Sequence, residues 1–377
     1  MAKGMYIGVD SKARKVTKAY IGVSNKARKI KKGYIGVGGK ARLFFSSEKQ
    51  LSYYGTATDL SVARRYLAGA SNASYAIFAG GYDGSNDYAT VDAYGATLTK
   101  SSPNQLTYSK RYLAGASVGN YAVFAGGHSN TGNHTTVDAY NTSLARSTPT
   151  KELSQYRRYL AGASVGNYAV FAGGSYVANS TNYTATVDAY NTSLARSTPT
   201  ALSVARDKLA GANNASYALF AGGYSSNGAV GTVDAYNAEL TRSTPTELSN
   251  LKYGLAGAST ETYAFFSSGS TSSGYNAWIN GYNANLVRSG TTTTTARRYL
   301  AGASVGNYAL FAGGSNGTGR LTMVDAIDAN MVRSEPTALS VARDNLAGAS
   351  VGNYALFAGG EVSGGSSSST VDVYQVV

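Results

Sequence analysis

The amino-acid sequence predicts an all-β protein, and three observations support that prediction. The 377 residues include 45 Gly and 31 Tyr and are 43% hydrophobic, a composition that favours strands and turns and allows a sizeable core. The tetrapeptide Leu-Ala-Gly-Ala recurs seven times. Each recurrence begins a unit with four short apolar runs bounded by Gly, Asn, Ser and Pro, which are typical of strands and turns.

The repeat unit has a nearly constant length and order. The tetrapeptide begins at Leu67, Leu113, Leu160, Leu209, Leu255, Leu300 and Leu346, with spacings of 45 to 49 residues. A polar turn, Tyr-Ala-apolar-Phe-Ala-Gly-Gly, a variable polar loop, Thr-Val-Asp-Ala-Tyr and a short turn follow, and Leu-x-Arg-Ser-Thr-Pro-Thr-x-Leu-Ser completes the unit. Four strands at this period are typical of a propeller blade. The sequence therefore predicts a seven-bladed β-propeller over residues 51–377.

The two ends of this region predict how the ring closes. The seventh unit reaches only Thr-Val-Asp-Val-Tyr at 370–374 plus three residues, so it lacks a fourth strand. Residues 54–60 align with 242–248, the fourth strand of another unit. We expect residues 51–60 to complete the seventh blade, because closure removes an open sheet edge.

The blades resemble kelch-type repeats. The resemblance rests on the Gly pairs that follow the second strand and on the Tyr of the third strand. The pairs begin at Gly80, Gly126, Gly173, Gly222, Gly313 and Gly359, and the tyrosines are Tyr94, Tyr140, Tyr190, Tyr236 and Tyr282. The sequence departs from that family at Ser268, which replaces the first Gly in blade five, and at Ile327, which replaces the Tyr in blade six. The kelch Trp is absent, and Lys or Arg stands in its place.

The first 45 residues carry a different repeat. Tyr-Ile-Gly-Val begins at Tyr6, Tyr20 and Tyr34, and Lys-Ala-Arg follows each copy after two residues. The intervening pairs, Asp-Ser, Ser-Asn and Gly-Gly, suit two-residue turns, so each unit is predicted to be a small β-hairpin. Such hairpins bury too little apolar surface to stand alone, and we expect residues 1–45 to act as an attachment module. They resemble segments of structural and tail-associated proteins of phages that infect Firmicutes.

Charge and composition exclude several classes of protein. The net charge of +13 is concentrated in residues 1–50, which contribute +11, whereas the remainder contributes only +2. The absence of Cys excludes a disulfide scaffold and a thiol enzyme, and two histidines cannot form a multi-histidine metal centre. No stretch has the length of a signal peptide's apolar core or of a membrane span. We expect neither a cofactor nor membrane insertion.

An enzymatic function is not expected. Some kelch-type propellers are copper oxidases, but His128 and His134 share one loop and do not complete such a ligand set. An Asp recurs at the same strand position as Asp92, Asp138, Asp188, Asp234, Asp325 and Asp372. A residue present in nearly every blade indicates blade architecture rather than a single catalytic site. We expect these carboxylates to accept hydrogen bonds from neighbouring strands or from Arg.

The loops between the second and third strands are the candidate ligand-binding region. They vary while the flanking strands stay almost identical, and variable loops on a rigid scaffold often carry recognition, although loops also vary without function. The candidate ligand-binding residues are Tyr82, Asp83, Tyr88, His128, His134, Tyr176, Tyr183, Tyr224, Tyr275 and Arg320. Tyr-, Asn- and Ser-rich loops suit sugars or protein surfaces. Arg65, Arg158 and Arg298 are structural candidates that could also attract an anionic glycan or phosphate.

The basic N-terminal repeats are the candidate partner-docking region. The candidate docking residues are Tyr6, Lys12, Arg14, Tyr20, Lys26, Arg28, Tyr34, Lys40 and Arg42. Basic residues interleaved with tyrosines also occur in nucleic-acid binding, but Lys on solvated edge strands and docking to an acidic protein fit this spacing as well. We do not expect nucleic acid as the partner.

These expectations combine into one functional hypothesis. The chain is predicted to be a non-enzymatic phage virion protein, anchored to capsid or tail proteins by the N-terminal repeats. Its propeller would bind a host-surface glycan or protein or decorate the shell, as a homo-oligomer in the particle. It would be made in the bacterial cytoplasm without a signal peptide. The alternatives are a bacterial propeller lectin and an intracellular interaction scaffold.

Overall fold

The computed structural model describes residues 6–9, 12–16, 18–23, 26–30, 32–37, 40–46, 50–176, 182–293 and 295–377. The chain divides into two compact units. One comprises residues 52–375, and the other comprises residues 1–51 with the final two residues. Among the described residues, no helix is long and apolar enough to span a membrane.

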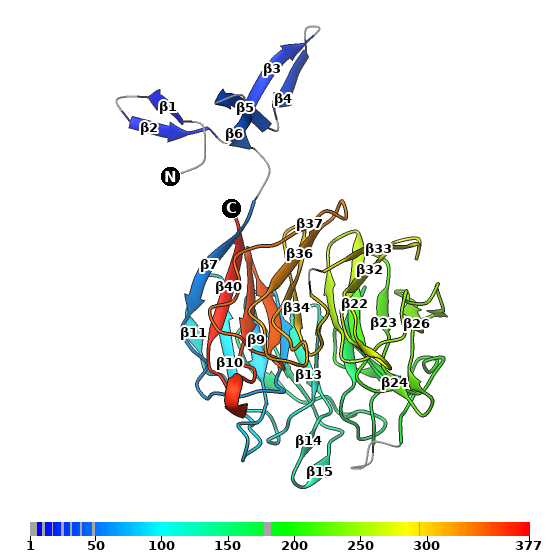
Figure 1. Ribbon diagram of the computed structural model, residues 1–377. Coiled ribbons are helices and arrows are strands. Elements are labelled where there is room, and N and C mark those ends of the chain that lie inside the picture. The colour runs from blue at the N-terminus through cyan, green and yellow to red at the C-terminus, as the bar shows by residue number, and fades with distance from the viewer. Residues whose placement is uncertain are drawn as a thin grey trace. The chain divides into compact units, whose positions relative to one another are not determined.

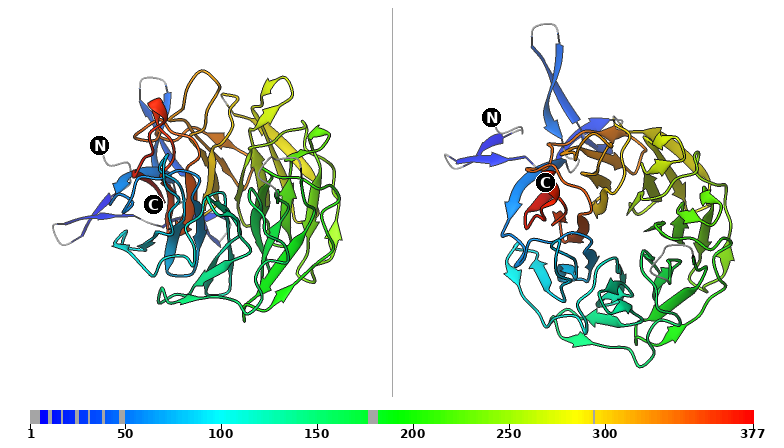
Figure 2. Two further views of the ribbon diagram at one scale, coloured as in Figure 1. Left: turned by 90° about the horizontal axis from the view of Figure 1, so that it is seen from below. Right: turned by 60° about the horizontal axis from the view of Figure 1, so that its bottom comes forward.

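The larger unit is a seven-bladed β-propeller, as predicted, with its blades arranged around a central axis (Figure 1; Figure 2, right). Each blade is a four-stranded antiparallel sheet. Blade 1 comprises β8 (Ala68–Ser71), β9 (Tyr75–Ala79), β10 (Val91–Gly95) and β11 (Lys100–Ser101), and blade 2 comprises β12 (Ala114–Val118), β13 (Tyr121–Ala125), β16 (Val137–Tyr140) and β17 (Arg146–Ser147). Blade 3 comprises β18 (Ala161–Val165), β19 (Tyr168–Ala172), β20 (Val187–Asn191) and β21 (Arg196–Ser197), and blade 4 comprises β22 (Ala210–Asn213), β23 (Ala218–Ala221), β26 (Val233–Tyr236) and β27 (Arg242–Ser243). Blade 5 comprises β28 (Ala256–Ser259), β29 (Tyr263–Ser267), β32 (Trp278–Asn283) and β33 (Arg288–Thr292), and blade 6 comprises β34 (Ala301–Val305), β35 (Tyr308–Ala312), β36 (Val324–Asp328) and β37 (Arg333–Ser334). Blade 7 comprises β38 (Ala347–Val351), β39 (Tyr354–Ala358), β40 (Val371–Val376) and β7 (Leu51–Ala57).

Strand β7 closes the ring, which confirms the predicted closure by an N-terminal strand. It is the outer strand of blade 7, next to β40. The backbone N–H groups of Gln50 and Val377 donate to each other's carbonyl oxygens at 2.8 and 3.0 Å. The Tyr53 hydroxyl donates to Asp372 at 2.7 Å. The last blade thus contains both ends of the propeller sequence and has no missing strand.

The up-and-down order of each blade creates two different faces. The loops between second and third strands and the linkers between blades lie at one end, called the loop face. The turns between first and second and between third and fourth strands lie at the other, called the turn face. In the described part of the loop face, three loops carry short hairpins, namely β14 (His128–Ser129) with β15 (Gly132–Asn133), β24 (Tyr224–Ser225) with β25 (Gly228–Ala229) and β30 (Ser270–Thr271) with β31 (Gly274–Tyr275). The blade 7 loop contains a 3-10 helix, η1 (Ser363–Gly365).

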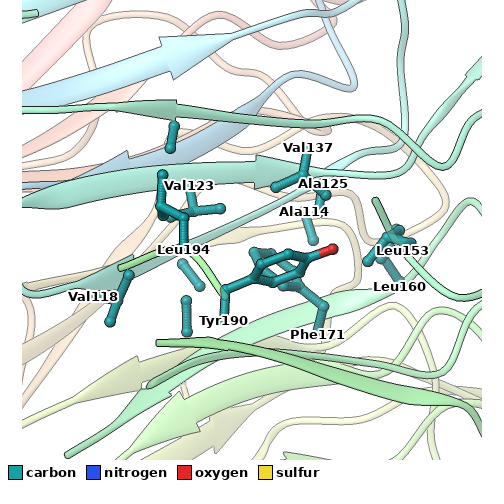
Figure 3. Close-up of a cluster of buried hydrophobic side chains, with 13 residues drawn as sticks. Ala114, Val118, Val123, Ala125, Val137, Leu153, Leu160, Phe171, Tyr190 and Leu194 are labelled. Carbon is teal, nitrogen blue, oxygen red and sulfur yellow. The ribbon is translucent and has the colours of Figure 1, made fainter. Parts of the chain in front are cut away.

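The hydrophobic core lies between adjacent blades. In the cluster of Figure 3, Val123 and Val137 of blade 2 pack against Phe171 and Tyr190 of blade 3. The two aromatic rings meet edge to face, 6.2 Å apart, and the Tyr190 hydroxyl donates to the Lys151 carbonyl oxygen at 3.1 Å. Equivalent clusters join most of the other blades. The apolar faces of the inner strands are thus buried mainly between neighbouring blades, as expected for a propeller.

Glycine is required where the innermost strands approach one another. A Cβ atom built on Gly162 would lie 2.3 Å from the Gly115 carbonyl oxygen, and Gly115 stands in the same relation to Gly69. All seven glycines of the Leu-Ala-Gly-Ala motif show such contacts, at 1.9 to 2.3 Å. The most regular residue of the repeat thus sets how closely the blades pack around the axis.

The repeated aspartates have the structural role that the sequence predicted. Asp234 is fully buried and pairs with Arg206 at 2.9 Å, and Asp188 pairs with Arg157 at 2.9 Å. Backbone N–H groups also donate to these carboxylates, as Ser203 does to Asp234 at 3.0 Å. The outer-strand Arg242 lies 3.8 Å from Asp234. The carboxylates thereby connect the linker, the third strand and the outer strand of the blade.

The N-terminal unit consists of three β-hairpins, as predicted. The hairpins are β1 (Tyr6–Val9) with β2 (Lys12–Lys15), β3 (Ala19–Val23) with β4 (Lys26–Ile30) and β5 (Lys32–Val37) with β6 (Lys40–Ser46). Each forms its own two-stranded sheet. The predicted turn pairs at 10–11, 24–25 and 38–39 lie outside the described residues.

Candidate functional site

The predicted loop residues of blade 1 contact one another and the neighbouring linkers. Asp83 accepts hydrogen bonds from the Tyr88 hydroxyl and from the backbone of Ser85 and Asn86, each at 2.7 Å. These bonds, that of Tyr88 foremost, hold the pKa of Asp83 well below its usual range. The Tyr82 ring lies beneath the Arg111 guanidinium, 4.3 Å from its centroid.

The two histidines of the blade 2 loop are held by separate local hydrogen bonds. His128 Nδ1 lies 2.9 Å from Asn133 Oδ1, and His134 Nε2 lies 2.9 Å from Ser129 Oγ. Both rings are partly buried, and burial lowers the pKa of each. The His134 ring also stacks on Tyr108 with centroids 5.3 Å apart. Among the described residues no group of three or more acidic or histidine side chains is arranged to hold a metal ion.

Most of the other predicted loop residues contact a neighbouring blade or linker, whereas Tyr176 contacts its own loop. The Tyr224 ring lies 6.2 Å from Tyr183 and 5.0 Å from Tyr253. Tyr275 lies beneath Arg298 at 5.3 Å, and Arg320 pairs with Asp344 at 3.0 Å. Tyr176 is half-buried and its backbone N–H donates to the Asn182 carbonyl oxygen.

The variable loops are therefore matched to the linkers between blades. The first loop residue of every blade forms an antiparallel bridge with the linker residue two positions before the Leu of the repeat motif, as Tyr82 does with Arg65. Side chains add ion pairs that cross blade boundaries, including Arg65 with Glu361 at 2.8 Å and Arg111 with Asp87 at 2.7 Å. Much of the loop variation thus serves contacts between neighbouring blades.

The loop face has a pocket of about 330 Å³ on the propeller axis, called the axial pocket. Seven equivalent residues, the axial ring, form its wall: Tyr66, Tyr112, Tyr159, Lys208, Gly254, Tyr299 and Asn345. The leucines that begin each Leu-Ala-Gly-Ala motif, one residue later, form its floor. The pocket combines an apolar base with hydroxyl, amide and ammonium groups above it.

Backbone hydrogen bonds close the axial ring. The N–H of each member donates to the carbonyl oxygen of the member in the preceding blade, as Tyr112 does to Tyr66 and Tyr159 to Tyr112, both at 3.0 Å. All seven residues have φ between 51° and 62°, although only Gly254 is a glycine. This left-handed conformation costs a bulky residue about 1 kcal/mol or more. The six larger side chains are therefore kept in the ring at a cost in stability.

The tyrosines of the axial ring form a compact arc. The Tyr112 ring lies 4.5 Å from Tyr66 and 4.2 Å from Tyr159, and Lys208 Nζ lies 5.3 Å above the Tyr159 ring. On the other side, the Tyr299 ring fills the space that the absent side chain of Gly254 leaves, 2.8 Å from a Cβ built there. Burial raises the pKa of Tyr66, Tyr159 and Tyr299, so these phenols stay protonated at neutral pH.

Each of the four ring tyrosines also lies beside the guanidinium group of the arginine that precedes it in the sequence. Arg65, Arg158 and Arg298 lie on the loop face, each with its guanidinium 4.7 to 5.5 Å from the ring of the tyrosine that follows it. The sequence offered these three residues as structural or anion-attracting, and the contacts with tyrosine rings hold them beside the axial pocket.

Sequence reasoning missed the axial ring. The signal was present, because the residue before each Leu-Ala-Gly-Ala motif changes among Tyr, Lys, Gly and Asn, whereas the residues after it hardly change. A variable position within a regular motif differs from a variable loop because its backbone is fixed.

The predicted docking residues lie in the three N-terminal hairpins. Arg14 pairs with Ile7, Arg28 with Ile21 and Arg42 with Ile35, and the Lys of each Lys-Ala-Arg pairs with the Val of Tyr-Ile-Gly-Val. This register is the same in all three hairpins. The side chains of Tyr20 and Tyr34 are both 57% exposed.

No protein-family model matches the chain, and no curated protein matches its sequence. Solved structures do match. One described as "Structure of YjhT" aligns with a TM-score of 0.56 and 12% sequence identity, covering 73% of this chain and 99% of that chain. At this identity the similarity shows the propeller fold alone.

Proposed function

We propose that this chain is a non-enzymatic phage virion protein, anchored to the particle by its basic N-terminal repeats. The propeller is displayed to bind a host surface or to decorate the shell. The resemblance of residues 1–45 to repeats of phage structural and tail-associated proteins motivates the virion assignment. The Gly pairs and third-strand tyrosines support the further proposal that the blades are of the kelch type.

The observation that carries the proposal is where the chain enters the propeller. Strand β7 begins at Leu51 on the turn face, beside the C-terminal end of β40, whereas the variable loops and the axial pocket lie on the loop face. The chain therefore joins the propeller at the end opposite to the variable loops and the axial pocket. Recognition residues on a rigid scaffold, away from the point of attachment, suit an attachment protein.

The N-terminal repeats have the properties of a docking segment. They carry most of the net charge, and the described aromatic side chains Tyr20 and Tyr34 are exposed. Isolated two-stranded hairpins are marginally stable, so a partner surface would order them. An acidic surface on a capsid or tail protein would provide charge complementarity, and several copies would then form a homo-oligomer on the particle.

Fractionation of the source culture tests the proposal. A lysate is separated into particle, membrane and soluble fractions, and peptides from residues 51–377 are quantified by mass spectrometry. We expect enrichment with particles. Recovery in the soluble or cell-wall fraction alone would contradict the virion assignment.

A bacterial carbohydrate-binding propeller is the second candidate. The axial pocket favours it, because tyrosines, an amide and an apolar floor are the groups that bind sugars. A sugar-binding pocket would suit a virion protein and a bacterial lectin alike, so the location of the protein distinguishes the two candidates.

A further inference from the structure

The axial pocket has features that the propeller fold does not require. The strands around it are almost identical, yet the seven wall positions hold four Tyr, one Lys, one Gly and one Asn. Gly254 shows that a glycine satisfies the backbone conformation at this position. Leu98, Leu144 and four equivalent turn residues have φ angles near 60° as well, but they are all Leu or Met. The ring differs from them in its varied residue types, and this variation at a fixed backbone position points to a role beyond folding.

The wall groups include hydrogen-bond donors that suit an anion. Among the described residues that line the pocket, Lys208 carries the one charged side chain. Its ammonium group lies against Tyr159, next in the ring to Tyr112. Protonated phenols and an ammonium group together bind a carboxylate through charge-assisted hydrogen bonds.

The remaining groups suit a hydroxylated body attached to that carboxylate. The seven leucines of the floor, such as Leu160 and Leu209, present apolar surface to C–H groups. The Asn345 amide on the opposite side of the ring from Lys208 both donates to and accepts from hydroxyl groups. A volume of about 330 Å³ is near the lower end of small-molecule sites, which span about 300–1,000 Å³.

The neighbouring arginines argue for one negative charge rather than two. Arg65 pairs with Glu361 at 2.8 Å, and Arg111 pairs with Asp87 at 2.7 Å. Arg298 lies between the rings of Tyr275 and Tyr299, at 5.3 and 4.7 Å, and Arg158 lies over the ring of Tyr159 at 5.3 Å. None of these guanidinium groups is among the described lining residues, so a doubly charged phosphate would meet a single lining cation and lack the paired donors it prefers.

We propose that the axial pocket binds a small carboxylate on a hydroxylated body the size of one sugar residue, which is the chemistry of an acidic sugar. This inference rests on the proposed function, because it gives the ligand class for the loop face. Lys208 holds the carboxylate, the tyrosine arc donates to its oxygens, and the leucine floor contacts the ring of the ligand.

The inference is tested by isothermal titration calorimetry, in which D-glucuronate is titrated into the purified full-length protein. D-Glucose and glucose 1-phosphate serve as the neutral and phosphorylated comparisons. We expect saturable glucuronate binding that Lys208→Met weakens about tenfold, as loss of one charge-assisted hydrogen bond predicts. Lys151→Met removes an exposed lysine outside the pocket and is expected to leave binding unchanged.

A second variant separates recognition from folding. Tyr112→Phe removes one phenol hydroxyl but keeps the ring stacked between Tyr66 and Tyr159, and we expect it to weaken glucuronate binding several-fold with an unchanged melting temperature. No glucuronate binding, binding unaffected by Lys208→Met, or tighter binding of glucose 1-phosphate would each overturn the inference. These outcomes are independent of particle association, so a virion protein without glucuronate binding contradicts only this inference.

Discussion

The Arg111 guanidinium lies 2.7 Å from the carboxylate of Asp87, and this ion pair joins blade 2 to the loop of blade 1. Asp87 also accepts a hydrogen bond from the backbone of Asn130, in the blade 2 loop, at 3.1 Å. Both charged side chains are largely shielded from water. Loop residues that vary between blades therefore stabilise particular blade boundaries.

The Asp87–Arg111 pair is expected to contribute measurably to stability. We predict that Asp87→Asn lowers the free energy of unfolding by about 1–3 kcal/mol, because it leaves a shielded Arg without its partner. Urea denaturation measures the change. Glu335→Gln is the matched control, because Glu335 is 52% exposed in its pair with Arg333 and its loss is expected to cost less than about 0.5 kcal/mol. Equal effects of the two substitutions would contradict the assignment.

Blade 5 lacks the buried ion pair of the other blades. Lys252 and Asn280 occupy the positions that Arg206 and Asp234 occupy in blade 4. The Lys252 ammonium donates to the Trp278 carbonyl oxygen at 2.9 Å, and burial lowers the pKa of Lys252 to about 7. The usual value is 10.5, so the unfolded chain binds this proton more tightly between pH 7 and 10.5. Stability is therefore expected to rise with pH across that window.

Asn280→Asp is predicted to restore the missing pair. Blade 2 shows that a lysine suffices, because Lys110 lies 3.4 Å from Asp138. We expect the free energy of unfolding at pH 7 to rise by about 1–3 kcal/mol and the increase between pH 7 and 10.5 to diminish. Denaturant titration at several pH values measures both. Asn283→Asp is the control, since Asp328 occupies that turn position in blade 6. A destabilised Asn280→Asp protein with an unchanged pH profile would refute the prediction.

Asp207 is predicted to make the free energy of unfolding decrease as pH rises between 3.8 and 6, the reverse of the effect of Lys252 at higher pH. Asp207 is buried, and among the described residues no side chain or backbone group lies in good hydrogen-bonding geometry with its carboxylate oxygens. Burial raises the pKa of Asp207 from 3.8 to about 6, although Lys208, the Ser175 hydroxyl and Arg158 act in the opposite direction. Between pH 3.8 and 6 the folded protein thus binds the Asp207 proton more tightly than the unfolded chain does. The contribution of Asp207 to the free energy of unfolding therefore falls as pH rises through that range.

Asp207→Asn tests this effect directly. We expect the variant to be more stable than the parent above pH 6, by up to about 3 kcal/mol, and less dependent on pH between 4 and 6. Thermal unfolding across that range provides the measurement. A parallel pH profile for the two proteins would show that Asp207 does not titrate there.

The inner glycines are predicted to tolerate no side chain. Gly162→Ala places a Cβ 2.3 Å from the Gly115 carbonyl oxygen, so adjacent blades must separate. We expect a loss of about 1–3 kcal/mol or more, measured by urea denaturation. Gly319→Ala is the control, because no atom lies within 4 Å of a Cβ built there. Similar stability of the two variants would contradict the close packing at the axis.

The sequence predicted the fold because its information is repeated. Seven copies of Leu-Ala-Gly-Ala set the number of blades, and the alignment of residues 54–60 with 242–248 identified the closing strand. The buried Asp–Arg pairs also followed from repetition, since a carboxylate such as Asp234 recurs at one strand position. A repeated motif identifies the residues that the blades have in common, and those residues form the core.

The site was less predictable, because it depends on differences between blades. The axial pocket gathers side chains such as Tyr66, Tyr112 and Lys208, which lie far apart in the sequence and meet only when the ring closes. The partner of Asp87 is likewise 24 residues away, in another blade. No local pattern marks such contacts. They follow from the geometry of closure, which brings one residue per blade to the axis.

We propose that the N-terminal repeats attach the protein to particles while the propeller remains free to bind. The most direct test of this attachment compares the full-length protein with a variant lacking residues 1–45, with both added to purified particles that lack the protein. Co-sedimentation is measured by quantitative mass spectrometry after circular dichroism and thermal unfolding have verified that the propeller is intact. We expect the full-length protein to sediment with the particles and the shortened protein to stay in solution. Equal sedimentation of the two proteins with the particles, or no sedimentation of either, would contradict attachment through the N-terminal repeats.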